Sequence, residues 1–186
     1  CGHEKTYNPY YSHLADRVCD YQNKCKFTFQ LSLWDAFKQF EDMKARKAAN
    51  LVKLLAHLML EFKLNINVLK PIDISPENMP ESAIIFLTIL FSNIFDAYED
   101  PMAVAELFRR GQPSREHLQQ QAIEDMDNSE DDVFAGNDRE ALKENISVFL
   151  MHYLEKSPKN MKKSAFRKNL KTAIKACETD GVDYMM

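Results

Sequence analysis

Apolar residues recur at helical spacing along most of the chain. In the first such segment, Tyr11, Leu14, Ala15, Val18 and Cys19 follow the i, i+3, i+4, i+7, i+8 positions of one helix face. The same period continues over residues 27–40, 45–62, 81–97, 101–108, 138–154 and 158–177, with a short helical piece at 66–69. The pattern therefore predicts an all-α protein in which amphipathic helices pack as antiparallel pairs, in an α-solenoid-like or bundle arrangement.

The second of these segments is apolar over a wide part of its circumference. One side carries Phe27, Leu31, Trp34 and Phe37, and the stripe is widened by Phe29, Leu33 and Phe40. A helix of this kind is expected to be enclosed by neighbours on several sides.

The predicted helices begin and end at recognisable residues. Asn8-Pro9 and Asp100-Pro101 each place a capping side chain before a proline that suits the first turn. Ser157-Pro158 begins the last helix in the same way, and Asp138 caps the helix before it. Pro71 ends the short piece at 66–69, and the three prolines between 71 and 81 predict an irregular connection.

The composition is that of one folded helical domain. The 186 residues are 45% hydrophobic and 28% charged, and four glycines and seven prolines are too few for an all-β fold. We expect residues 4–110 and 138–178 to form a single domain. Because the chain begins with Cys1 and not with methionine, we expect a fragment, a processed product or an incomplete gene model.

An acidic segment interrupts the helical pattern at residues 111–137. Glu124 to Asp132 hold six acids and no base, so like charges repel one another and little apolar surface is available for burial. We therefore expect an acidic flexible loop inserted in the domain. Ser129 is followed by three acids, a context that suits phosphorylation by acidophilic kinases. The alternative is an unmodified linker serine.

The last predicted helix is basic on one side and apolar on the other. Between 156 and 175 there are eight lysines or arginines and no acid: Lys156, Lys159, Lys162, Lys163, Arg167, Lys168, Lys171 and Lys175. Such a face suits RNA phosphates or an acidic protein partner. The alternative is a solvated, lysine-rich helix face that balances the acidic loop within the same chain.

The residues that usually carry catalysis or bind metals are scattered. The four cysteines form no CxxC pair and the five histidines do not cluster with them, so we expect reduced packing cysteines and no metal site. His57 lies among apolar residues, and we interpret it as a core histidine. Asp35 is expected to accept a hydrogen bond from the neighbouring Trp34 indole. No phosphate-binding glycine loop is present, and we expect no enzyme activity, cofactor or small-molecule substrate.

The longest apolar run, Ala83 to Phe95, has thirteen residues, whereas about 20 are needed to span a bilayer. We therefore expect a buried helix in this segment and no membrane partner.

Three blocks of the sequence resemble the C-terminal helical region of nucleolar scaffold proteins related to yeast Sgd. The blocks are Tyr7-Asn8-Pro9-Tyr10-Tyr11, the Phe27 to Asp35 stretch with Trp34-Asp35, and Asn50-Leu51 leading to Ala56-His57-Leu58. Proteins of this family combine a domain like the middle region of translation initiation factor four-G with an MA-three domain. The resemblance covers residues 4–95 well, residues 142–176 weakly, and the acidic segment not at all.

The resemblance implies an MA-three fold of antiparallel, HEAT-like helix pairs. It implies a nucleolar, and hence nuclear, scaffold role in pre-ribosomal RNA processing for the small subunit. The implied partners are pre-ribosomal proteins and a DEAD-box helicase of the initiation factor four-A type. In the family the helicase contact is associated mainly with the preceding middle domain. Because the family has a further helix pair before the position of Cys1, we expect the first hairpin of the domain to be missing here and an apolar face to be exposed.

A spliceosomal scaffold family offers an alternative, since it also pairs a four-G-middle-like domain with an MA-three domain. It shares the first helix and the segment around His57. The TYNPYY and FQLSLWD blocks fit the nucleolar family better. Both families are helicase-associated RNA-processing scaffolds, and an RNA-binding role for the basic last helix remains a second alternative.

Overall fold

The protein is a stack of helices. The computed structural model describes residues 4–38, 43–75, 77, 79–109, 131–156 and 163–178. The helices are α1 (Tyr10–Tyr21), α2 (Asn23–Phe37), α3 (Ala45–Leu60), the 3-10 helix η1 (Ile66–Leu69), α4 (Glu81–Ala97), α5 (Pro101–Arg109), α7 (Asp131–Phe149), the π-helical turn η2 (Leu150–Glu155) and α8 (Ser164–Glu178). No strand occurs within these ranges, so the all-α prediction is confirmed.

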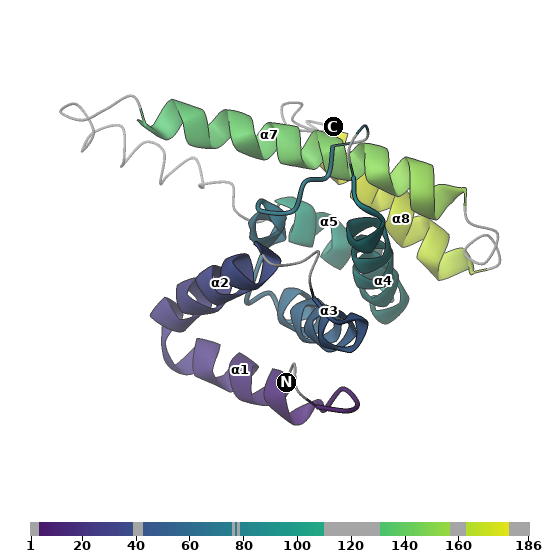
Figure 1. Ribbon diagram of the computed structural model, residues 1–186. Helices are drawn as coiled ribbons and strands as arrows, with labels where there is room; N and C mark the ends of the chain where they lie inside the picture. Colours follow the sequence, from purple (N-terminus) through teal and green to yellow (C-terminus); the bar gives the residue numbers. More distant parts are fainter. Residues whose placement is uncertain are drawn as a thin grey trace.

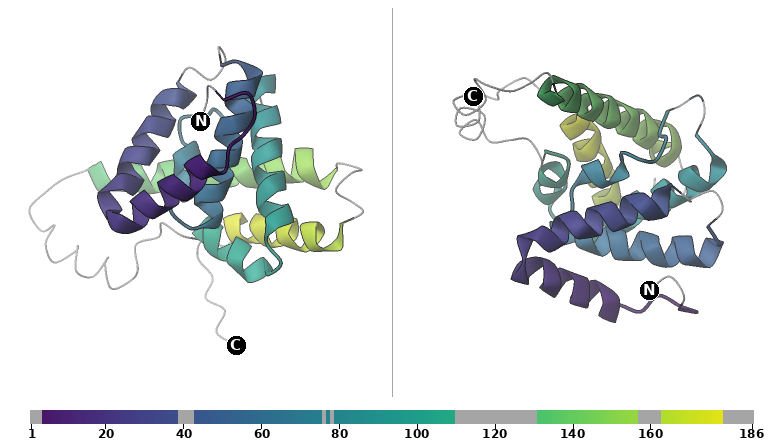
Figure 2. Two further views of the ribbon diagram at one scale, coloured as in Figure 1. Left: turned by 90° about the horizontal axis from the view of Figure 1, so that it is seen from below. Right: turned by 60° about the vertical axis from the view of Figure 1, so that its left-hand side comes forward.

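Helices α1 and α2, α3 and α4, and α7 and α8 pack against each other, whereas α5 packs on α8. The hairpin of α1 and α2 lies at one end, α3 and α4 follow, and α7 and α8 lie across the other end (Figure 1). Figure 2 shows the same layered order from two other directions. Because α8 contacts α4, α5 and α7, it joins the central helices to the far end of the stack.

The predicted capping residues at two helix starts are confirmed. Asn8 Oδ1 accepts a hydrogen bond from the backbone N–H of Tyr10 at 3.0 Å, and Asp100 Oδ1 accepts one from Met102 at 2.9 Å. Each bond pairs a backbone donor that has no partner within its own helix. The spans of η1 and α4 also agree with the sequence prediction.

The centre of the core is a cluster of phenylalanines from four helices. Phe91 of α4 stacks on Phe108 of α5, with ring centroids 6.0 Å apart, and lies 6.1 Å from Phe149 of α7. Phe95 of α4 meets Phe166 of α8 edge-on at 5.5 Å. Each of these rings is buried. Aromatic pairs at such separations add to the stabilisation from burial, so the cluster fixes α8 against α4 and α5.

The prediction that α2 is enclosed on several sides is wrong. Phe27 is 62% exposed and Leu31 is 40% exposed, whereas Leu33 and Phe37 are buried. On α1, Leu14 and Val18 are likewise exposed, and the buried face carries Ser12, Ala15 and Cys19. Helical spacing identifies an apolar stripe but not the element that covers it, and α1 and α2 cover only part of each other's stripe.

The expected pairing of Asp35 with the Trp34 indole is also wrong. The Asp35 carboxylate accepts instead from Lys38 Nζ at 3.1 Å, and the buried Trp34 Nε1 has no hydrogen-bond partner among the described residues. Consecutive residues of an α-helix point in directions about 100° apart, so their side chains do not face each other.

Helix α7 begins seven residues before the predicted start at Asp138. Residues 131–137 of the expected acidic loop therefore belong to a helix, and residues 111–130 lie outside the described residues. Acidic residue types are favoured in the first turn because the N-terminal end of a helix carries partial positive charge. A run of acids therefore does not exclude a helix start. None of the described helices is both long and apolar enough to cross a membrane.

Candidate functional site

The cationic face of α8 is the candidate site that the sequence predicts. Arg167, Lys168, Lys171 and Lys175 are all exposed. They lie opposite a buried face formed by Phe166, Asn169, Leu170, Ala173, Ile174, Ala176 and Cys177. The helix is thus amphipathic in three dimensions, and its basic residues share one side at i, i+4, i+8 spacing.

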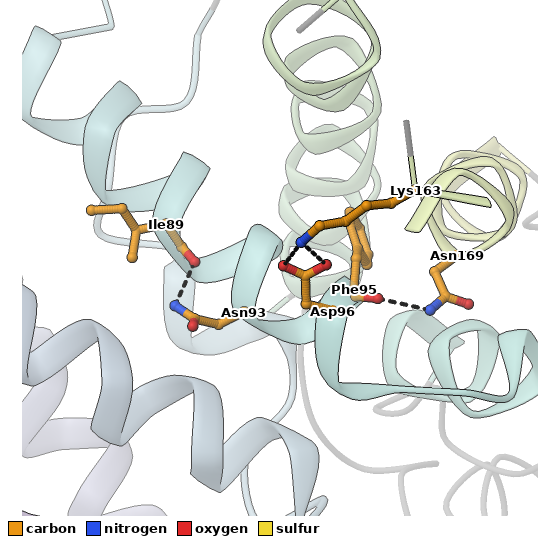
Figure 3. Close-up of polar contacts among 6 residues, drawn as sticks. All are labelled: Ile89, Asn93, Phe95, Asp96, Lys163 and Asn169. Carbon is orange, nitrogen blue, oxygen red and sulfur yellow. Dashed lines mark hydrogen bonds and ion pairs between the residues drawn. The ribbon is translucent and has the colours of Figure 1, made fainter. Parts of the chain in front are cut away.

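Asn169 holds α8 against the end of α4. Its side-chain amide donates to the backbone oxygen of Phe95 at 2.9 Å (Figure 3). The same amide donates to the backbone oxygen of Tyr98 at 2.7 Å. Those carbonyls lie at the C-terminal end of α4, where no further helical N–H is available. Asn169 is fully buried, so the two bonds fix both the position and the rotation of α8. They thereby determine which residues face the solvent.

Lys163, which directly precedes α8, pairs with a residue of α4. Its Nζ lies 2.8 and 2.7 Å from the two carboxylate oxygens of Asp96 on α4 (Figure 3). Both side chains remain partly exposed, and a surface ion pair of this kind contributes little to stability. The pair neutralises one charge at the start of α8, and its acid comes from α4 and not from the acidic segment.

Of the remaining predicted residues, Lys156 is exposed after η2, and Lys159, Lys162 and Ser129 lie outside the described residues. The described part of the predicted surface therefore comprises Lys163 and the four basic residues of α8. Its role as a binding surface stays a prediction.

The described residues bring no catalytic group together. The ring of His57 is half-buried and meets His13 edge-on at 5.1 Å, and its Nε2 has no hydrogen-bond partner among the described residues. No three histidine, cysteine, aspartate or glutamate side chains in the described ranges could hold a metal ion. Cys19, Cys25 and Cys177 are free thiols, and burial is the main cause that raises the pKa of Cys19.

The resemblance implied an exposed apolar face, and the first hairpin exposes Tyr10, Leu14, Val18, Tyr21, Phe27 and Leu31. Sequence reasoning missed a second surface, an acidic groove between α7 and α8. The glutamates of that groove were visible in the sequence at i, i+4 spacing on one helix, but their meeting with the end of α8 depends on the tertiary packing.

Residues 1–64 match the MA3 domain. The matched segment is 64 of the 186 residues, and it is similar to this family. The match includes α1, α2 and α3 and ends before η1, so the cationic α8 and the acidic groove lie outside it. It agrees with the observed helix pairs and confirms the predicted resemblance.

Two relatives are similar to longer stretches of the chain than the family model matches. The chain is 40% identical over 105 residues to Nucleolar MIF4G domain-containing protein 1 of Mus musculus, which is 56% of this chain and 12% of that protein. It is 27% identical over 182 residues to Suppressor of glycerol defect protein 1 of Schizosaccharomyces pombe, which is 92% of this chain and 20% of that protein. The chain thus spans a fifth or less of these relatives.

The splicing alternative has weaker support. The chain is 26% identical over 107 residues to the Pre-mRNA-splicing factor CWC22 homolog of Xenopus laevis, which is 58% of this chain and 13% of that protein. This identity is lower than that to the mouse nucleolar protein over a segment of similar length. The similarities therefore favour the nucleolar family.

Proposed function

We propose that the chain is a non-enzymatic, protein-binding scaffold module of the nucleolus that acts in pre-ribosomal RNA processing for the small subunit. The observation that carries the proposal is the similarity to a relative named as nucleolar, together with similarity over 92% of the chain to the S. pombe protein. The partners in this proposal are pre-ribosomal proteins and a DEAD-box helicase of the initiation factor four-A type.

The surface of the described residues supports a docking role. The first hairpin exposes six large apolar side chains, and exposed apolar patches of folded proteins are typical of contacts with other proteins. At the other end of the stack, α8 presents a basic side that complements an acidic protein surface. A helical stack with one continuous apolar core separates these two surfaces, as expected of a module that holds partners in a fixed relation.

A purified helicase of the initiation factor four-A type provides the direct test. We expect it to bind the 186-residue chain in isothermal titration calorimetry. Replacing Arg167→Glu and Lys171→Glu together should weaken the complex by about tenfold, because two attractive contacts become repulsive. The matched control is Lys24→Glu with Lys47→Glu, which changes the charge equally at exposed positions of α2 and α3. Absence of any complex at low salt contradicts a direct helicase contact by this chain.

A cellular test addresses the nucleolar part of the proposal. A fluorescent fusion of the chain should concentrate in nucleoli, and its overproduction should raise the level of unprocessed small-subunit precursor RNA by competing for the same partners. Enrichment in splicing speckles with unchanged ribosomal precursors would instead support the spliceosomal alternative.

The exposed basic residues of α8 favour RNA binding as a second candidate function. In this case, binding to a single-stranded oligonucleotide should weaken steeply with salt, with a slope of about −0.7 in log K against log salt for each neutralised phosphate. The Arg167→Glu, Lys171→Glu variant should make the slope less steep by roughly 1.4, whereas the α2–α3 control should leave it unchanged. No detectable RNA binding at low salt excludes this second function.

A further inference from the structure

An acidic groove lies between α7 and α8, at the opposite end of α8 from Lys163. Its volume is about 480 Å³, within the range of pockets that take several side chains or a small ligand. Glu140 and Glu144 of α7 line one wall, and Glu178, the last residue of α8, lines the other. No lysine, arginine or histidine lines the groove.

The three carboxylates are held near one another without compensation. None of them has an ion-pair partner among the described residues. Glu140 and Glu144 are four residues apart on α7, where like charges repel each other. Glu178 adds a negative charge at the C-terminal end of α8, where the helix dipole is already negative. A cation bound in the groove would therefore relieve several unfavourable interactions at once.

A buried hydroxyl group gives independent support for a ligand at this place. Ser147 lines the groove between Glu144 and Val148, and the residue is 4% exposed. Its Oγ has no hydrogen-bond partner among the described residues. A buried hydroxyl without a partner is costly, and unpaired buried polar groups are few in folded proteins. A ligand with a donor group, such as an ammonium or guanidinium, would supply the missing hydrogen bond after a rotation of the side chain.

The residues that line the groove also indicate what kind of ligand it would bind. Val148 and Met151 add apolar surface beside the carboxylates, and Met151 belongs to the π-helical turn η2, a type of turn that is frequent at functional sites. The aliphatic stems of lysine and arginine pack on such surfaces while their charged ends reach polar groups. The three carboxylates do not converge closely enough to hold a metal ion. RNA phosphates would be repelled by the negative charge.

We propose that this groove binds a basic amphipathic segment of a partner protein, with a lysine or arginine between the glutamates and an apolar residue against Val148 and Met151. Two antiparallel helices present a groove into which a third helix can lie. The inference rests on the proposed scaffold function, since it takes the partner to be a protein, and it names the surface and the chemistry of one such partner.

The test uses the 186-residue chain and a fluorescein-labelled peptide in which lysine and leucine repeat at helical spacing. Fluorescence anisotropy should show binding that is absent for the same peptide with glutamate in place of lysine. Glu144→Lys with Glu178→Lys should weaken binding by about tenfold or more. Both changes suit their helices, because the first makes an i, i+4 pair with Glu140 and the second places a base at a helix C-terminus. Loss of binding would therefore not reflect unfolding.

The matched control is Glu61→Lys with Glu99→Lys, which makes the same charge change at exposed residues away from the groove and should alter the affinity by less than about twofold. Ser147→Ala should lower the affinity about threefold without lowering the unfolding midpoint, because the hydroxyl is unpaired in the free chain. Equal effects of the two double variants, or equal binding of the glutamate peptide, overturn the proposal.

The helicase titration described above separates the two conclusions. If the helicase binds but the peptide does not, the groove proposal fails and the scaffold function stands. If the peptide binds as expected and the helicase does not, the groove stands and the helicase partnership fails.

Discussion

Phe62 ends α3 in a backbone conformation that glycine usually adopts, with φ at 55°. The turn is closed by two backbone hydrogen bonds, from Phe62 N–H to Met59 O at 3.0 Å and from Lys63 N–H to Leu58 O at 2.8 Å. The aromatic ring of Phe62 packs on Tyr98, whose hydroxyl donates to Leu60 O at 2.8 Å. These contacts offset the cost of the left-handed conformation, and the turn directs Lys63 toward α1.

Lys63 joins the end of α3 to α1 through two carboxylates. Its Nζ lies 3.2 Å from Asp16 and also donates a hydrogen bond to Asp20. Asp16 and Asp20 are four residues apart on one helix and repel each other unless a cation lies near them. Replacing Lys63→Met should lower the free energy of unfolding at neutral pH by roughly 1 kcal/mol, measured by urea denaturation. Lys38→Met is the control, because the ion pair of Lys38 with Asp35 is largely exposed.

The Lys63 contribution should depend on pH. Its hydrogen bond to Asp20 is the main cause that raises the pKa of Lys63 above the ordinary value of 10.5. A raised pKa in the folded state means that the stabilisation is complete below pH 10.5 and is lost as the pH rises through the folded-state pKa. The difference between wild type and Lys63→Met should therefore narrow in strongly alkaline solution. A difference that stays constant there contradicts the assigned ion pair.

Helix α2 carries one exposed and one buried phenylalanine. Phe27 and Phe37 are equivalent in residue type, but Phe27 is 62% exposed and Phe37 is 4% exposed, with its ring 5.5 Å from that of Phe86. Phe37→Ser should lower the free energy of unfolding by about 3–5 kcal/mol, because it leaves a cavity and buries a hydroxyl. Phe27→Ser should change it by less than about 0.5 kcal/mol.

Chemical denaturation of the two serine variants compares these positions directly. Each serves as the control for the other, because the substitution and the helix are the same. A large loss of stability for Phe27→Ser would mean that another part of the chain covers this side of α2 in solution.

Local sequence signals predicted the helix starts at Asn8 and Asp100 and the end at Pro71, but the cap expected at Asp138 lies inside α7. Asn8, Asp100 and Pro71 act through neighbours in the sequence, so their effect can be inferred without the fold. The turn at Phe62 was missed because no glycine marks it, and its support comes from Tyr98, far away in the sequence. The apolar period alone wrongly predicted an enclosed α2, because the period does not say what covers the stripe, whereas the resemblance implied an exposed apolar face.

The candidate surfaces also differ in whether they depend on spacing within one helix or on contacts between helices. The basic stripe on α8 depends on i, i+4 spacing within one helix, and the structure places Arg167, Lys168, Lys171 and Lys175 on an exposed side. The pairing of Lys163 with Asp96 and the meeting of Glu144 with Glu178 join residues from different helices. Neither could be predicted from spacing, because both depend on how α8 is held by Asn169.

At the scale of the whole molecule, one continuous apolar core joins the MA3 part to the C-terminal helices. Buried residues from α1 through α8 belong to a single cluster, and Trp34 of α2 packs against it. Phe91 lies near the middle of this cluster, in contact with aromatic rings of α4, α5 and α7. Helix α2 contacts η1 and α1, α1 contacts α3, and α3 contacts α4. Because these helices are packed in series, loss of packing at Phe91 of α4 should also destabilise α2, which carries Trp34.

Phe91→Ala should therefore lower the stability of the whole described fold by about 3–5 kcal/mol. Trp34 is the only tryptophan of the chain, so its fluorescence reports on α2, whereas far-UV circular dichroism reports on all helices together. If residues 4–110 and 138–178 form one domain, both signals should shift to the same lower midpoint. Ile85→Ala is the control, because Ile85 is 52% exposed on the same helix. A Trp34 transition that keeps its wild-type midpoint while the circular dichroism transition moves would show two independently folding units.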